Sequence, residues 1–174
     1  MAYNKLVLNA LRKLNEEFSD DKKQIEEAWK EISPIIYDGI DDSRKMLVDF
    51  VYEENSADNP YERQEIAETI DAIDTEIDKL KRTLASTKPK DFVEMMGPVD
   101  DLVWYHLDSV LVGDDEAYAR NPSALKELLE PISKMVTSIF KVLNDYGVKA
   151  DINDVKFDTS LSDFIFGDYI ANLV

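Results

Sequence analysis

The spacing of apolar residues between Asn59 and Leu84 constrains the fold of this chain more than any other feature. The apolar positions alternate steps of four and three and are Ile66, Ile70, Ile73, Ile77, Leu80 and Leu84. A repeat of this period puts all six on one stripe of an α-helix, at heptad positions a and d. Asn59 and Pro60 suit the cap and the first turn of such a helix. The sequence therefore predicts a helix from Pro60 to about Ala85.

The apolar stripe needs a packing partner, and two are conceivable. Other helices of the same chain are the simpler one, and we expect the stripe to pack on them. The rival is an intermolecular coiled coil. Three heptads are marginal for that, and the flanking e and g positions mix charge signs without a clear pairing code. These flanking residues are Ala67, Asp74, Lys81, Thr69, Glu76 and Thr83.

Helical spacing predicts further helices on both sides of this one. Before it, we expect a first helix over 2–18. A second helix should begin near Ser19, be kinked or broken at Pro34 and end at Gly39. A third should begin at Asp42 or Ser43. After it, the breakers divide the chain further. They predict a short helical piece over 91–96, a helix over about 98–112, a helix from 121 to 147 interrupted at Pro131, and a final helix after Ser160.

Residues 148–158 alternate loosely, which indicates a short extended or hairpin segment. The expected fold class is therefore all-α, a single-domain bundle of six or seven helices that spans residues 1–174. The 174 residues suit one domain. The chain has no cysteine, no signal-peptide pattern and no apolar run of membrane-spanning length. We therefore expect a cytoplasmic protein.

Little in the sequence supports catalysis or a cofactor site. The single histidine, His106, cannot supply the paired ligands of a metal bundle and is expected to be a partly buried structural residue. The five glycines are scattered, so no phosphate-binding loop is formed. One enzymatic alternative is a magnesium-dependent all-α nucleotide pyrophosphohydrolase, for which Glu68 and Asp71 match one short carboxylate motif. Such a site needs carboxylates that point inward together. We expect no enzyme, no cofactor and no metal.

Charge is the strongest signal of function. The formal net charge is −17, which repels nucleic acid and anionic membranes and attracts basic proteins. The charge is concentrated, because residues 53–78 contain ten acids and a single base, Arg63. Residues 79–97, by contrast, carry five bases and two acids. Because helical residues three apart drift by about 60° around the axis, the acids should wrap the polar face of the helix as a slanted ridge.

A second acidic stretch follows in residues 98–120, with a net charge of −5. Asp100, Trp104 and Asp108 are spaced by four and share one helical face, as an aromatic anchor ringed by acids would. A Trp packed under a neighbouring helix is the alternative. The predicted partner-binding residues are Glu53, Glu54, Glu62, Glu65, Glu68, Asp71, Asp74, Glu76, Asp78, Asp100, Trp104 and Asp108.

These features favour a non-enzymatic binding protein that occupies a basic, nucleic-acid-binding surface of a partner protein such as a nuclease. In charge and size, though in no motif, the chain is similar to nucleic-acid-mimicking inhibitors. Phage anti-CRISPR and anti-restriction proteins are of this kind, as are immunity proteins that neutralise nuclease toxins. The main alternative is a helical adaptor that oligomerises through its Ile/Leu stripe, with the acids serving solubility.

Overall fold

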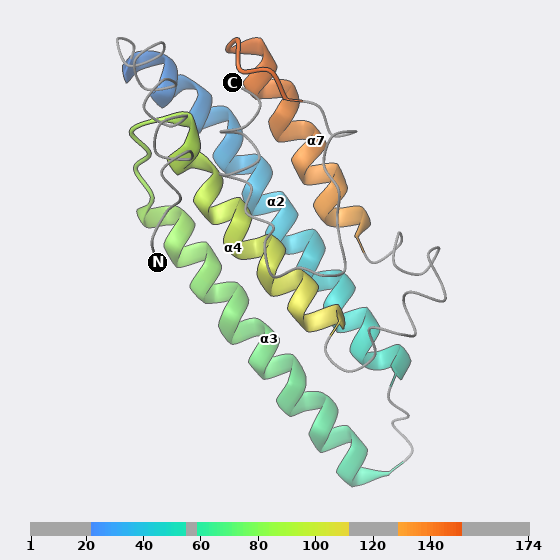
Figure 1. The fold of residues 1–174 in the computed structure, drawn as a ribbon. Coiled ribbons are helices and arrows are strands. Elements are labelled where there is room, and N and C mark those ends of the chain that lie inside the picture. The colour runs from blue at the N-terminus through green and yellow to red at the C-terminus, as the bar shows by residue number, and fades with distance from the viewer. Residues whose placement is uncertain (1–21, 55–58, 112–128, 151–174) are drawn as a thin grey trace, which may run out of the picture.

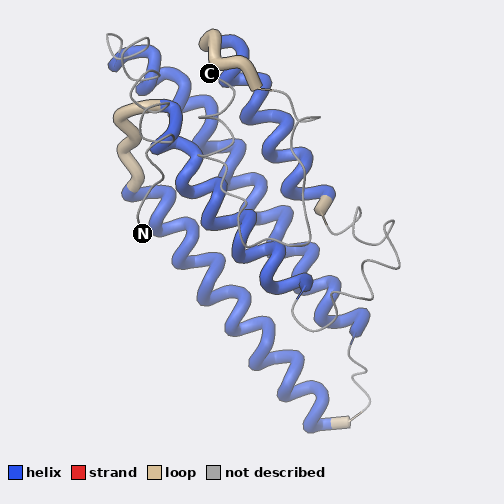
Figure 2. Tube along the Cα trace, in the orientation of Figure 1, coloured by secondary structure: helices blue, strands red, loops and turns tan. Residues whose placement is uncertain are grey.

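Four helices and the loops beside them make up the part of the chain that a computed structural model describes, which is residues 22–54, 59–111 and 129–150. They are α2 (Lys22–Glu54), α3 (Pro60–Ser86), α4 (Phe92–Leu111) and α7 (Glu130–Asp145), and these residues contain no strand. Consecutive helices run in opposite directions along one common axis (Figure 1). Helix and connecting loop account for all of the described chain (Figure 2). The all-α prediction is confirmed for these ranges.

Helix α2 is the centre of the bundle, because it packs against α3, α4 and α7. Its buried stripe recurs every three or four residues from Ile25 through Ile32, Ile36 and Ile40 to Val51, within a helix of 33 residues. Helix α7 faces this stripe with an apolar side that includes Ile132, Ile139 and Leu143. No described helix has the length and apolar content to cross a bilayer.

The predicted end at Gly39 and the predicted start of a third helix at Asp42 or Ser43 are wrong, and no break occurs at Pro34, since these residues lie inside the continuous helix α2. A proline inside a helix costs about 3 kcal/mol, whereas each fully buried isoleucine contributes about 1.5–3 kcal/mol. Interrupting the stripe would therefore lose more than the proline costs. A glycine occurs inside the helix at position 39 for a different reason, because a Cβ atom there would lie 2.4 Å from Met135 Sδ of α7. Glycine at this point lets two helices approach closely.

The predicted division at Gly97 and Pro98 is also wrong, because α4 runs without interruption from Phe92 to Leu111. Pro98 is itself buried, so its ring adds to the apolar face that continues through Val99 and Leu102. Pro131, at which the sequence predicts an interruption of the helix over 121–147, lies in the first turn of α7, and residues 121–128 before it lie outside the described part. A missing N–H costs nothing there, because first-turn N–H groups have no partner within the helix.

Both ends of α3 match the prediction. The Asn59 Oδ1 atom accepts hydrogen bonds from the backbone N–H groups of Tyr61 and Glu62, each at 3.0 Å. The helix ends at Ser86, one residue beyond the expected end. Gly147, with φ 84°, ends the turn after α7 as expected. The helices predicted over 2–18 and after Ser160, the 121–128 stretch and most of 148–158 lie outside the described residues.

A buried polar pair joins α2 to α4. Ser43 Oγ lies 2.6 Å from His106 Nδ1, and both residues are fully buried. His106 is therefore more deeply buried than the sequence suggested. A buried polar group requires a hydrogen-bond partner, so this contact fixes the register of α4 against α2.

Candidate functional site

The apolar stripe of α3 is covered by helices of the same chain. Ile66, Ile73, Ile77 and Leu84 are buried, and Ile70 and Leu80 pack partly buried against the same core. Helix α3 contacts both α2 and α4. The stripe is therefore not available to a second chain in this fold, and the adaptor alternative loses the surface on which it depended.

The acidic ridge crosses the opposite, outward side of α3. We use the name acidic ridge for Glu62, Glu65, Glu68, Asp71 and Asp74, which follow each other at intervals of three. The middle three residues are exposed, whereas the two end residues are half-buried. This gradient follows from the 60° drift per step, which carries the ridge from one flank of the apolar stripe across the solvent side to the other flank.

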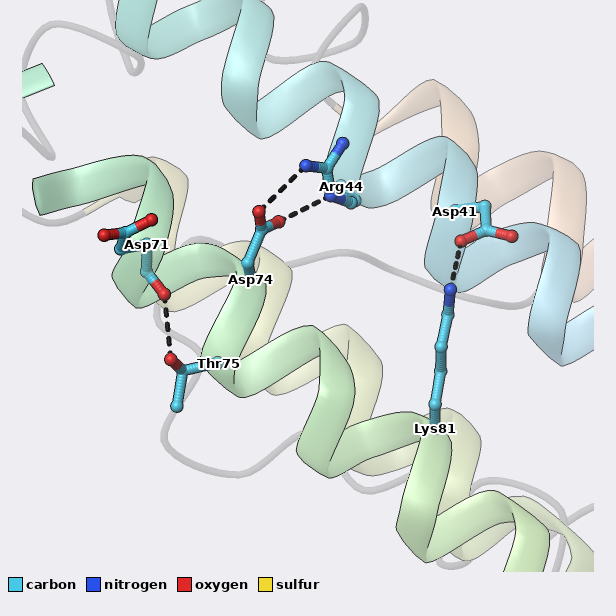
Figure 3. Close-up of polar contacts among 6 residues, drawn as sticks. All are labelled: Asp41, Arg44, Asp71, Asp74, Thr75 and Lys81. Carbon is cyan, nitrogen blue, oxygen red and sulfur yellow. Dashed lines mark hydrogen bonds and ion pairs between the residues drawn. The ribbon is translucent and has the colours of Figure 1, made fainter. Parts of the chain in front are cut away.

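Asp74, at the end of the ridge, is paired within the protein. Its two carboxylate oxygens accept hydrogen bonds from Arg44 of α2 at 2.6 and 3.0 Å (Figure 3). The guanidinium bonds hold the pKa of Asp74 below its usual value. A bidentate pair of this kind fixes the geometry of both side chains. Asp74 therefore serves the contact between α2 and α3, which the sequence did not reveal.

A second ion pair continues the same contact. Lys81 Nζ lies 2.6 Å from Asp41 Oδ1 of α2. Asp74 and Lys81 both occupy the e position of the heptad, and their partners Arg44 and Asp41 appear in reverse order on α2. Two of the three e positions thus form ion pairs with the antiparallel helix α2, and the third is Ala67.

The central ridge acids differ from Asp74. Within the described ranges, none of Glu65, Glu68 and Asp71 forms an ion pair. Glu68 accepts a hydrogen bond of 2.8 Å from the neutral side chain of Gln64, and Asp71 bonds Thr75 only through its backbone carbonyl (Figure 3). These three carboxylates therefore keep their negative charge directed at solvent.

The remaining acids of α3 have separate surroundings. Glu76 lies on the flank that faces α4 and pairs with Lys79 at 3.0 Å. Nearby on α4, burial raises the pKa of Asp101, and the charge of Lys79 partly offsets this effect. Asp78 lies with Lys81, Arg82 and Ala85 around an open hollow of about 450 Å³ at the C-terminal half of α3. Positive and negative groups are therefore mixed both around Glu76 and around the hollow beside Asp78.

The predicted aromatic anchor on α4 does not join the ridge. Tyr105 is partly buried against the core, and its pKa is raised first by this burial and then by the charges of Glu76 and Asp74 on α3. Trp104 precedes it by one residue and therefore points about 100° away. Trp104 and Asp100 are half-buried, and Asp100 has an interaction partner. The side chains of Asp108, Glu53 and Glu54 lie outside the described part.

Two exposed aromatic residues are absent from the sequence prediction. Tyr61 is 84% exposed and Tyr52 is 57% exposed, and they are the exposed large apolar side chains among the described residues. Tyr52 lies two residues before the end of α2, and Tyr61 is the second residue of α3. The sequence does contain one indication that Tyr61 is exposed. Tyr61 lies off the a/d stripe, at the f position one heptad before Glu68.

The carboxylates required for the magnesium alternative do not converge. Glu68 and Asp71, which match the carboxylate motif, are exposed on the outward side of α3. Among the residues that the structure describes, no three His, Asp or Glu side chains are grouped so as to hold a metal ion. Comparisons with protein-family models, with curated proteins and with solved structures found no match.

Proposed function

We propose that this chain is a non-enzymatic acidic binding protein that occupies a basic, nucleic-acid-binding surface of a partner protein. The observation that carries the proposal is the set of exposed carboxylates at Glu65, Glu68 and Asp71, which have no ion-pair partner among the described residues. Their chemistry complements the lysine- and arginine-rich grooves of proteins that handle nucleic acids.

The spacing of these acids supports the same conclusion. Residues three apart on a helix are separated by about 4.5 Å along the axis. One strand of B-DNA carries one charge per about 3.4 Å. The ridge therefore approaches the linear charge density of a single nucleic-acid strand over its central turns, although the protein's whole surface is far more dilute. A groove that binds a phosphate backbone would meet a similar row of negative charges.

The mechanism would combine long-range attraction with local contacts. Complementary potentials accelerate the encounter of charged partners and weaken as salt screens them. Because the acids lie on a helix whose other side is fixed in the core, they are presented without a conformational change. Occupation of the groove would exclude nucleic acid, as an inhibitor or an immunity protein of a nuclease does.

Two charge-reversal variants with equal net charge test the proposal. One changes Glu65, Glu68 and Asp71 to Lys. The other changes three exposed acids of α2, Glu26, Asp38 and Asp49, to Lys. Each protein is immobilised and exposed to a lysate of its native host at low salt, and bound proteins are identified by mass spectrometry as the salt concentration rises.

The proposal expects a basic protein that elutes at moderate salt and loses at least about tenfold in affinity for the α3 variant, but much less for the α2 variant. The captured protein should also lose its nucleic-acid binding when this chain is added. Equal losses for the two variants would show that net charge alone acts. Binding that is insensitive to salt would contradict the electrostatic mechanism.

A further inference from the structure

The exposed tyrosine at the start of α3 lies beside the acidic ridge. Tyr61 precedes Glu65 by four residues and Glu68 by seven, so the three side chains follow one line along the outward face. Helical side chains lean toward the N-terminus of their helix, which brings Glu65 toward the ring of Tyr61. In Figure 1 this end of α3 extends past the end of α4.

Tyr61 is held in place by the helix cap. Its backbone N–H donates to Asn59 Oδ1 at 3.0 Å, and Pro60 restricts the backbone that precedes it. The backbone is therefore ordered, whereas the ring is 84% exposed. A tyrosine of this kind has only two side-chain torsions left to fix when it binds, so it offers a large contact area at a small entropic cost.

We infer that Tyr61, together with Glu65 and Glu68, binds an arginine side chain of a basic protein partner. The guanidinium group is planar, stacks on aromatic rings and donates to carboxylates, whereas the lysine ammonium group is a compact charge that stacks less well. An arginine that lies on the ring of Tyr61 can extend its N–H groups toward the carboxylate of Glu65. This assignment rests on the proposed function and specifies the chemistry of the partner.

The charge of the surroundings excludes other occupants. Residues 45–54 and 59–71 hold seven acids and two bases. A second copy of this chain would bring the same negative charge to the contact, and nucleic acid would be repelled as well. The exposed aromatic residue therefore complements a cationic protein surface.

Binding of two fluorescently labelled probes, nona-arginine and nona-lysine, tests the inference by anisotropy at several salt concentrations. The wild-type protein should prefer nona-arginine. Tyr61→Ala should weaken nona-arginine binding by about two- to fivefold, the value of an exposed cation–π contact, and change nona-lysine binding less. Tyr61→Phe should retain the preference, and the exposed Thr83→Ala at the other end of α3 should behave as the wild type. Circular dichroism should show unchanged helix content, because the Tyr61 ring contributes little to the core.

The outcomes separate this inference from the proposed function. If the α3 charge-reversal variant loses both probes but Tyr61→Ala binds nona-arginine as the wild type does, the arginine site is wrong and the acidic binding surface stands. If Tyr61→Ala loses the preference while charge reversal has no effect, the ridge proposal is wrong, and so is the part of this inference that assigns Glu65 and Glu68 to the arginine site. If the wild type binds neither probe at low salt, both are wrong.

Discussion

The close approach of α2 and α7 at Gly39 leads to a test of the bundle. A Cβ atom at position 39 would lie 2.4 Å from Sδ, 2.8 Å from Cγ and 3.1 Å from Cβ of Met135. Glycine in the interior of a helix is otherwise unfavourable, by about 1 kcal/mol relative to alanine. Gly39→Ala therefore sets a gain in helix propensity against a steric conflict.

The two contributions can be compared. Inserting a methyl group into a packed core costs about 1–3 kcal/mol, which exceeds the gain in propensity. We expect Gly39→Ala to lower the free energy of unfolding by about 1 kcal/mol and the melting temperature by about 3 °C for a chain of this size. Met135→Ala removes the two closest atoms, although it lowers stability by about 2–5 kcal/mol through the cavity it leaves.

A double-mutant cycle measured by urea unfolding, followed by circular dichroism, isolates the contact. In the Met135→Ala background, Gly39→Ala should raise stability by up to about 1 kcal/mol, because helix propensity then acts against only the 3.1 Å approach to the Cβ atom of residue 135. The sign of the substitution thus reverses, and the coupling between the two positions should be about 1–2 kcal/mol. If Gly39→Ala raises stability equally in both backgrounds, the helices do not approach at this point and the argument for Gly39 fails.

Three further predictions concern the polar contacts. Ser43→Ala should lower stability by about 1–3 kcal/mol in thermal melts, since it removes the 2.6 Å contact to buried His106. Asn59→Ala should lower stability by about 1 kcal/mol by removing two cap bonds at 3.0 Å, and hydrogen exchange should increase in the first turn of α3 and not in α7. Because Arg44 lowers the pKa of Asp74, this pair stabilises the fold at neutral pH, and the contribution is lost as pH falls through the folded-state pKa. Asp74→Asn should therefore lower stability at pH 7 by less than about 1 kcal/mol, given that both side chains are partly solvated, and the difference from wild type should vanish in acid.

The sequence predicted some helices well and others poorly, for physical reasons. Helix α3 could be predicted from its own residues, because a heptad stripe defines its length and an Asn-Pro cap defines its start. Helix α2 was divided wrongly at Pro34 and Gly39, because the local preferences of these residues were weighed without the packing that overrides them. The need for glycine at position 39 comes from Met135, which is 96 residues away in the chain. No local pattern contains that information.

The acidic ridge, too, could be predicted from the sequence only in part. Its wrapping around the helix follows from spacing alone, and so does the departure of Asp74 from the solvent side. That Asp74 meets Arg44 depends on the register between two antiparallel helices, which the spacing within either helix does not fix. The exposure of Tyr61 likewise depends on where the neighbouring helices end.

The fold itself gives no reason for the acids at the centre of the ridge. The contacts between α2 and α3 use Asp74 and Lys81, and the core uses the apolar stripe. Like charges three residues apart disfavour a helix by a few tenths of a kcal/mol per pair, so Glu65, Glu68 and Asp71 oppose α3 slightly. Lysine at the middle position would convert both repulsions into attractions and would keep the helix soluble. A sequence selected for stability alone would gain from that change, and the cationic partner that we propose would account for the three acids.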